Sequence, residues 1–92
     1  MESIQTTEHW QSIFENWPDV IPRRGIIVSK YGETIPFANF LISEGLLLVE
    51  RDGPDASGTR RAILGYDSIS MVKLASNAEL SQFMSMGFQT TI

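Results

Sequence analysis

The chain has 92 residues, a net charge of −4 at pH 7 and no cysteine. This length suits one small domain, and the lack of cysteine excludes disulfide bonds, thiolate metal sites and thiol nucleophiles. The 11 acidic residues outnumber the 7 basic ones, which disfavours nonspecific binding to phosphate backbones, since such binding relies on lysine and arginine.

The first predicted element is a helix over residues 8–17. Four apolar side chains recur at i, i+3, i+4 and i+7, the spacing of one helical face: Trp10, Ile13, Phe14 and Trp17. Thr7 is the expected N-cap, and Pro18 is expected to end the helix. We expect this aromatic face to pack on a core or over a sheet, and the alternative is a docking face for a partner protein.

Five strands are predicted next, within residues 25–74. Short apolar runs separated by turn residues define them: 25–30, 33–42, 46–51, 60–65 and 68–74. Pro36 lacks an amide donor and indicates a sheet edge or a bulge. Residues 52–59 contain two glycines, a proline and two aspartates and are expected to form a hairpin loop. Such a series of short strands predicts a small barrel or sandwich.

The last predicted element is a short helix over residues 77–86. Ser76 or Asn77 is the expected cap, and Gly87 is the expected stop. The whole chain, residues 1–92, is therefore interpreted as a single domain: a helix, five strands and a short helix.

No residue pattern indicates catalysis or metal binding. The only histidine is His9, which leaves no base for a nucleophile. Residues 53–58 have the glycine spacing of a phosphate-binding loop, but Thr59 occupies the place of the lysine and a predicted strand follows. We expect a protein that is not an enzyme and that binds neither a metal nor a cofactor. A small enzyme or a metal-dependent domain is the third hypothesis, after the two binding functions below.

The order and spacing of these elements resemble the Sm-like (LSm) family over residues 8–74. The resemblance rests on the turn Tyr31-Gly32, on Ile35 at a core position, and on two short segments. These segments are residues 43–49 (SEGLLLV) and 64–70 (LGYDSIS). The resemblance implies a five-stranded barrel with an N-terminal helix. It also implies ring assembly, because strand four of such domains commonly pairs with strand five of a neighbour.

Three positions depart from the family's pattern. Phe37 stands where a glycine is usual, Ser43 replaces an acidic residue, and residues 65–67 (GYD) lack the usual basic or histidine side chain. The family's RNA pocket is therefore not carried over to this chain.

Two functions follow as hypotheses. The first is a non-enzymatic Sm-like domain that self-associates through its edge strands and presents a binding surface, with RNA as one ligand. The second is a protein-interaction module of SH3-like or PH-like type with no nucleic-acid function. The residues expected to contact RNA or a partner are two basic pairs and two tyrosines: Arg23, Arg24, Arg60, Arg61, Tyr31 and Tyr66. Both tyrosines are expected to be exposed, and Phe37 and Phe40 are expected to be in the core.

We expect a cytoplasmic protein that does not bind membranes. No apolar run approaches the ~18 residues that span a bilayer. The N-terminus carries Glu2 and Glu8 where a signal peptide has basic residues.

Overall fold

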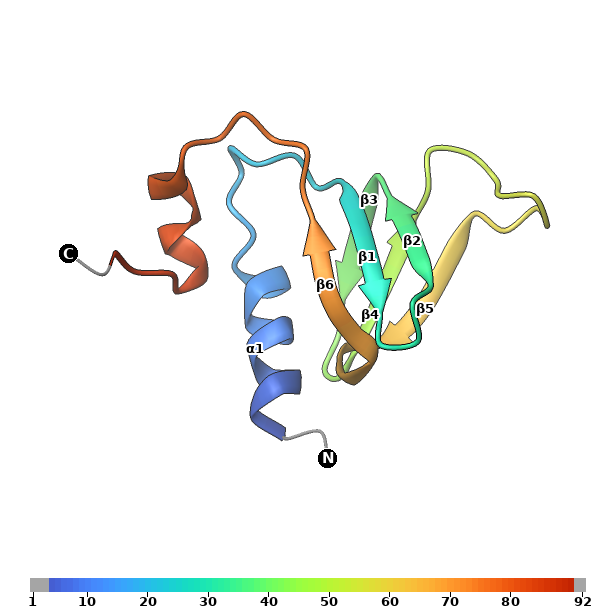
Figure 1. Ribbon diagram of the computed structural model, residues 1–92, viewed down its shortest axis with the longest axis horizontal. Helices are drawn as coiled ribbons and strands as arrows, with labels where there is room; N and C mark the ends of the chain where they lie inside the picture. Colours follow the sequence, from blue (N-terminus) through green and yellow to red (C-terminus); the bar gives the residue numbers. More distant parts are fainter. Residues whose placement is uncertain (1–3, 91–92) are drawn as a thin grey trace.

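The computed structural model describes residues 4–90 and is mainly β (Figure 1). One α-helix precedes six strands, and a short 3₁₀ helix follows them. In chain order the elements are α1 (Ile4–Glu15), β1 (Gly25–Ser29), β2 (Thr34–Phe37), β3 (Asn39–Ile42), β4 (Leu46–Glu50), β5 (Arg61–Gly65), the 3₁₀ turn η1 (Tyr66–Ser68), β6 (Ile69–Lys73) and the 3₁₀ helix η2 (Leu80–Met86). The predicted β class and the two flanking helices are confirmed.

The strands form two antiparallel sheets, in the orders β2-β1-β6 and β3-β4-β5. The predicted five-stranded barrel is therefore wrong, since there are six strands and no barrel closes within residues 4–90. The difference arises inside the stretch 33–42, which was predicted as one strand. Phe37 pairs with Gly25 of β1, whereas Asn39 pairs with Glu50 of β4. Ala38 lies between them and donates its amide to the Glu50 carbonyl at 2.6 Å, so the chain changes sheets at this residue.

Aromatic side chains join helix α1 to both sheets. Phe14 is fully buried and its ring centroid lies 5.4 Å from Trp17, 5.0 Å from Phe40 and 6.4 Å from Phe37. Trp10 and Ile13 are partly buried against the same core. The interpretation of this helix face as core is confirmed, and its interpretation as a docking face is wrong.

The bounds of α1 differ from the prediction at both ends. The helix begins at Ile4, so Thr7 lies inside it and is not the N-cap. It ends at Glu15, three residues before Pro18, after which the Trp17 indole donates to the Ile21 carbonyl at 3.0 Å. That hydrogen bond satisfies the polar edge of a buried ring and fixes the turn that leads to β1.

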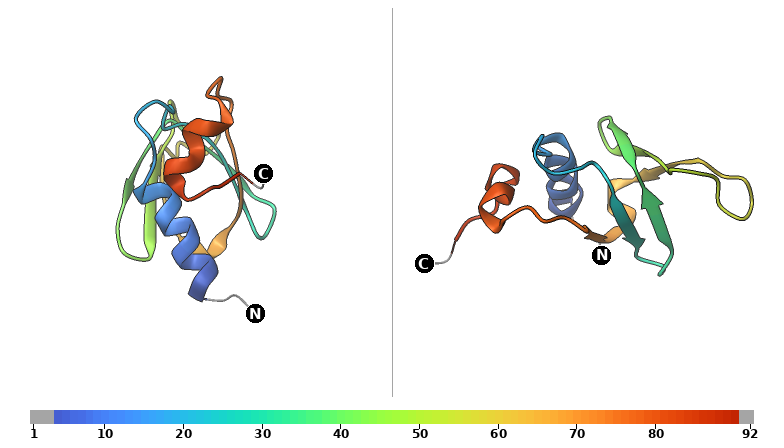
Figure 2. Two further views of the ribbon diagram at one scale, coloured as in Figure 1. Left: turned by 90° about the vertical axis from the view of Figure 1, so that its left-hand side faces the viewer. Right: turned by 90° about the horizontal axis from the view of Figure 1, so that it is seen from above.

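The C-terminal helix is shorter than predicted and is of the 3₁₀ type. It begins at Leu80, and its cap is Glu79, which forms a capping box with Gln82. Gly87 ends it with φ = 103°, as expected from the sequence. Figure 2 shows η2 beside α1, on the side away from the sheets. Met86 is buried there and Phe83 packs against the core.

A bulge in the β1–β6 pair changes which side chains of β6 face the core. Val28 pairs with Met71, but Ser29 pairs with Ile69, so Ser70 is the extra residue. Ile69 is buried, whereas Met71 is 48% exposed. Regular alternation along 68–74 predicts that these two side chains share one face, and the bulge instead places them on different faces.

Candidate interaction surfaces

Each sheet has three strands, so its two outer strands each leave one edge unpaired: β2 and β6 in the first sheet, and β3 and β5 in the second. Within the described chain, β5 pairs only with β4, and β6 pairs only with β1. The three residues of η1 connect them. An exposed apolar side chain marks each strand, since Ile63 of β5 is 67% exposed and Met71 of β6 is 48% exposed. An edge strand of this kind offers backbone N–H and C=O groups to a further strand.

The basic pairs predicted to bind phosphate are largely engaged within the chain. The Arg23 guanidinium carbon lies 4.4 Å from the Phe40 ring centroid, and this side chain donates to the Phe40 carbonyl at 3.4 Å. Arg24 forms an ion pair with Asp52. Arg61 forms one with Glu50, at 2.8 Å between nitrogen and oxygen. These pairs are exposed and contribute little to stability, but each places a carboxylate beside a proposed phosphate-binding cation. Arg60 is exposed.

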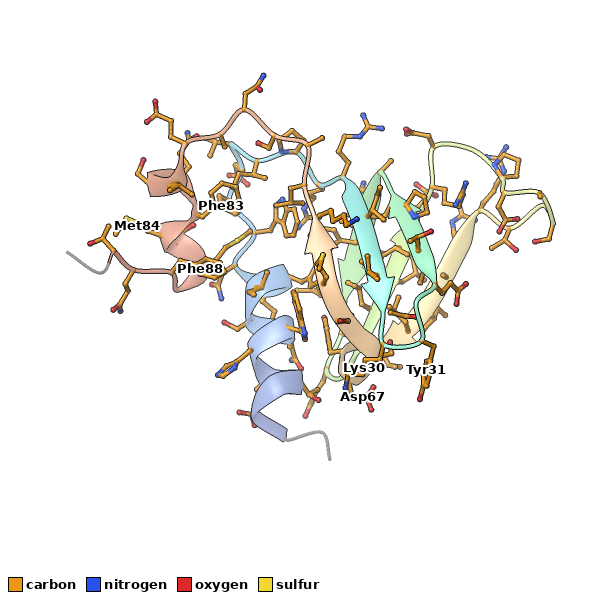
Figure 3. All side chains as sticks on the ribbon, viewed as in Figure 1. Lys30, Tyr31, Asp67, Phe83, Met84 and Phe88 are labelled. Carbon is orange, nitrogen blue, oxygen red and sulfur yellow. The ribbon has the colours of Figure 1, made fainter. Side chains whose placement is uncertain are left out.

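The two tyrosines that were predicted to contact RNA or a partner lie in opposite environments. Tyr31 is 92% exposed at the β1–β2 turn, near Lys30 and Asp67 (Figure 3). Tyr66 is fully buried, so its expected exposure is wrong. The η1 turn brings its ring against α1, 6.1 Å from the Phe14 ring. Burial raises the pKa of the Tyr66 hydroxyl, and the Glu15 carboxylate raises it further. No group within residues 4–90 forms a hydrogen bond with this hydroxyl.

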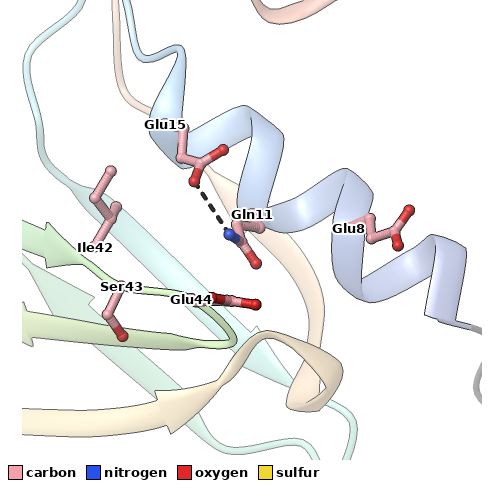
Figure 4. Close-up of a pocket in the computed structure, with 6 residues that line it drawn as sticks. All are labelled: Glu8, Gln11, Glu15, Ile42, Ser43 and Glu44. Atoms are coloured by element: carbon pink, nitrogen blue, oxygen red, sulfur yellow. Dashed lines mark hydrogen bonds between the residues drawn. The ribbon is translucent and has the colours of Figure 1, made fainter.

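An acidic hollow of about 610 Å³ lies between α1 and the β3–β4 turn (Figure 4). Six residues line it: Glu8, Gln11, Glu15, Ile42, Ser43 and Glu44. The Gln11 amide donates to Glu15 at 3.1 Å and its oxygen accepts from the Gly45 amide at 3.2 Å, which joins the helix to the turn. Three carboxylates and no cation line this hollow, so it is unsuited to phosphate. Sequence reasoning missed it, because its residues come from two segments with no shared motif.

The outer face of the second sheet carries exposed apolar side chains. Leu41 of β3, Leu48 of β4 and Ile63 of β5 are in register across the three strands. Leu41 and Ile63 are both 67% exposed, and Leu46 is 49% exposed. We call the surface formed by Leu41, Leu46, Leu48 and Ile63 the β3–β5 face. The uninterrupted apolar run 46–49 was the available signal, since a strand that is apolar on both faces contacts something on each side.

Searches for similar proteins leave the family open. No family model matches the chain, and no curated protein or solved structure shows significant similarity to it. Between Ile4 and Thr90, no helix is long and apolar enough to cross a membrane. The same residues include no group of three or more histidine or carboxylate side chains that could hold a metal ion.

Proposed function

We propose that this chain is a non-enzymatic, Sm-like assembly domain in which β5 of one copy pairs with β6 of another. One observation carries the proposal: β5 and β6 are outer strands of different sheets, and only the three residues of η1 separate them in the chain. Such pairing would complete the backbone hydrogen bonds of both edges. The resemblance to Sm-like domains, whose corresponding strands pair between neighbours, supports the same arrangement.

The composition of the edges favours pairing. β5, Arg61–Gly65, contains neither proline nor lysine, the residues with which proteins commonly protect an open edge. The one lysine of β6 is Lys73, which is the last residue of that strand. Ile63 and Met71 would each lose exposed apolar surface in the pair, which is favourable.

RNA is the less supported ligand of such an assembly. Of the six proposed contact residues, Tyr66 is buried and Arg24 and Arg61 are paired with carboxylates. Tyr31 and Arg60 are exposed and remain the residues available for stacking and for phosphate contact. The observations therefore favour association with protein, in the first instance with copies of the same chain.

The test is solution mass by light scattering on a sizing column. We expect a discrete species that is a multiple of the 10.3 kDa chain. Met71→Lys should dissociate it, because the added charge lies on the paired edge. Ile26→Lys is the matched control, since Ile26 is 38% exposed on β1, the inner strand of the same sheet.

A wild-type monomer at all concentrations would contradict the proposal, as would equal effects of the two lysine variants. Binding of an RNA homopolymer at low salt tests the ligand separately. Salt-sensitive retention that is lost in Arg60→Glu would favour RNA, and no retention would favour a protein-only assembly.

A further inference from the structure

The β3–β5 face is built from rows of side chains that cross all three strands. Leu41 pairs with Leu48, and Leu48 pairs with Ile63, so these three residues form the middle row. Leu46 and Gly65 pair in the next row. Leu41 and Ile63 are each 67% exposed, whereas Leu48 between them is only partly exposed. The apolar part of the face therefore has one protruding side chain on each outer strand.

A row of polar side chains borders this apolar area at one end. Asn39 pairs with Glu50, and Glu50 pairs with Arg61. Each of them is two positions along its strand from the middle row, so the polar row points to the same side of the sheet as Leu48. Arg61 and Glu50 form their ion pair on this face and remain 63% and 44% exposed. The face therefore has an apolar end and a charged end.

Two hollows follow the same division. The first, of about 270 Å³, is lined mainly by the apolar rows. The second, of about 290 Å³, lies between the middle row and the polar row. Figure 1 shows α1 and η2 gathered at one end of the molecule, so neither helix lies over β5. An exposed apolar face of this kind commonly marks an interaction site.

We propose that two copies of the chain associate by stacking their β3–β5 faces about a two-fold axis that runs parallel to the strands. Such an axis places β4 over β4, and β3 of one copy over β5 of the other, so that each row meets the same row. Leu41 of one copy then faces Ile63 of the other copy. Both side chains lose exposed apolar surface, which is favourable. Stacked sheets of this kind lie about 10 Å apart, with strand directions within about 30° of each other.

The charged row identifies a second copy as the occupant. In the stacked arrangement, each Arg61 lies beside Glu50 of its own chain and close to Glu50 of the other chain, and the four groups carry no net charge. A wholly apolar partner would remove water from the Glu50–Arg61 pair and offer it no charge in return, which is unfavourable. A two-fold axis across the strands would place the charged row over Leu46, with the same penalty. Charge complementarity therefore selects both the partner and its direction.

The face contact is small and should be weak by itself. Three strands of about five residues, spaced about 4.8 Å apart, cover roughly 15 by 17 Å, or about 250 Å² on each copy. A stable interface buries about 800 Å² on each partner, so we expect a concentration-dependent dimer. The contact uses the outer face of the second sheet, whereas the edge contact proposed above uses the backbone of β5 and β6. Each of the two contacts can therefore fail without the other.

Sedimentation equilibrium of Met71→Lys protein, at concentrations up to about 1 mM, measures the face contact without edge pairing. We expect a monomer–dimer equilibrium. Adding Leu41→Glu should raise its dissociation constant at least about tenfold, because Ile63 of the other copy would meet a carboxylate. Val20→Glu adds the same charge at a side chain that is 60% exposed and outside the face, and it should change the constant less than about threefold. A Met71→Lys protein that stays monomeric, or equal effects of the two glutamate variants, would overturn the proposal.

Charge reversal tests the polar row separately, in the same Met71→Lys protein. Arg61→Glu would bring four carboxylates together in the stacked rows and should abolish the dimer. Glu50→Arg combined with Arg61→Glu restores an ion pair within each chain and balances the stacked rows again. This double variant should dimerise within about threefold of its parent. A double variant that is folded by circular dichroism but monomeric would overturn the two-fold arrangement. A difference between the wild type and Met71→Lys concerns the edge contact alone.

Discussion

The Phe14 and Phe40 rings meet edge to face, with centroids 5.0 Å apart and planes at 88°. Phe14 belongs to α1 and Phe40 to β3, so this contact attaches the helix to the second sheet. Both side chains are almost completely buried. Edge-to-face pairs of this kind add about 0.5–1.5 kcal/mol to the stabilisation from burial alone.

Replacing Phe14 with alanine should lower the free energy of unfolding by about 3–5 kcal/mol, because it leaves a cavity beneath the helix. Urea denaturation followed by tryptophan fluorescence measures the change, since Trp17 stacks on Phe14. Val20→Ala is the control, and at 60% exposure it should change stability by less than about 0.5 kcal/mol. A loss below about 1 kcal/mol for Phe14→Ala would be incompatible with this ring packing.

Gly25→Ala should destabilise the first sheet. A Cβ atom at Gly25 would lie 2.4 Å from the Lys73 carbonyl oxygen, so β1 and β6 would have to separate. We expect a loss of about 1–3 kcal/mol in the free energy of unfolding, measured by thermal denaturation. Gly53→Ala is the matched control, because nothing lies within 4 Å of its added methyl group. Equal melting temperatures for the two variants would contradict the close approach of β1 and β6.

Tyr66→Phe should leave stability unchanged or raise it by up to about 1 kcal/mol. The hydroxyl of Tyr66 is buried and forms no hydrogen bond with the described residues, so removing it eliminates an unsatisfied polar group. Chemical denaturation at pH 7 measures the difference. A loss of more than about 1 kcal/mol would mean that the hydroxyl has a partner, such as a buried water molecule.

The same hydroxyl should make the protein sensitive to alkaline pH. Burial raises the pKa of Tyr66 above the ordinary value of 10.0. Above pH 10 the unfolded chain therefore releases this proton while the folded chain retains it, and the free energy of unfolding falls as the pH rises. Melting temperatures measured between pH 8 and pH 11 should fall more steeply in the wild type than in Tyr66→Phe. Parallel curves for the two proteins would contradict the raised pKa.

Asp55 should order the loop between β4 and β5. Its carboxylate accepts hydrogen bonds from the Ser57 amide at 2.9 Å, the Ser57 hydroxyl at 2.7 Å and the Thr59 amide at 2.9 Å. These bonds lower the pKa of Asp55 below its ordinary value of 3.8. The stabilisation is therefore present at neutral pH and is lost only as the pH falls through this lowered value. Asp55→Ala should speed amide exchange at Ser57 and Thr59 at pH 7, whereas Asp52→Ala should not.

The sequence predicted the elements better than their connections. The apolar spacing of Trp10, Phe14 and Trp17 was enough to place a buried helix, because only one helical face can hold all three. The break at Ala38 was not predictable, since within residues 35–42 only Asn39 is polar and no clear turn signal marks the change of sheet. What ends β2 is the choice of partner strand, β1 before Ala38 and β4 after it. The conformational preferences of the residues around Ala38 do not determine which strand they pair with.

The exposure predicted for the site residues was right for Tyr31 and wrong for Tyr66, for a related reason. Tyr31 was correctly expected to be exposed because it precedes Gly32, whose φ of 85° marks a tight surface turn. Tyr66 also stands at a turn, but that turn lies beneath α1, and its burial depends on a helix more than 50 residues away in sequence. The β3–β5 face was overlooked because an apolar strand residue indicates burial but does not reveal which molecule provides the cover.

The short η1 connection has a geometric consequence for any assembly built through β5 and β6. With only Tyr66–Ser68 between them, and Tyr66 held in the core, the two edges keep a fixed angle to each other. Each added copy would then turn by the same amount relative to the last. That repeated rotation determines whether a growing chain of copies closes on itself after a set number or continues as a helix. Three residues would thereby decide how many copies make one complete assembly.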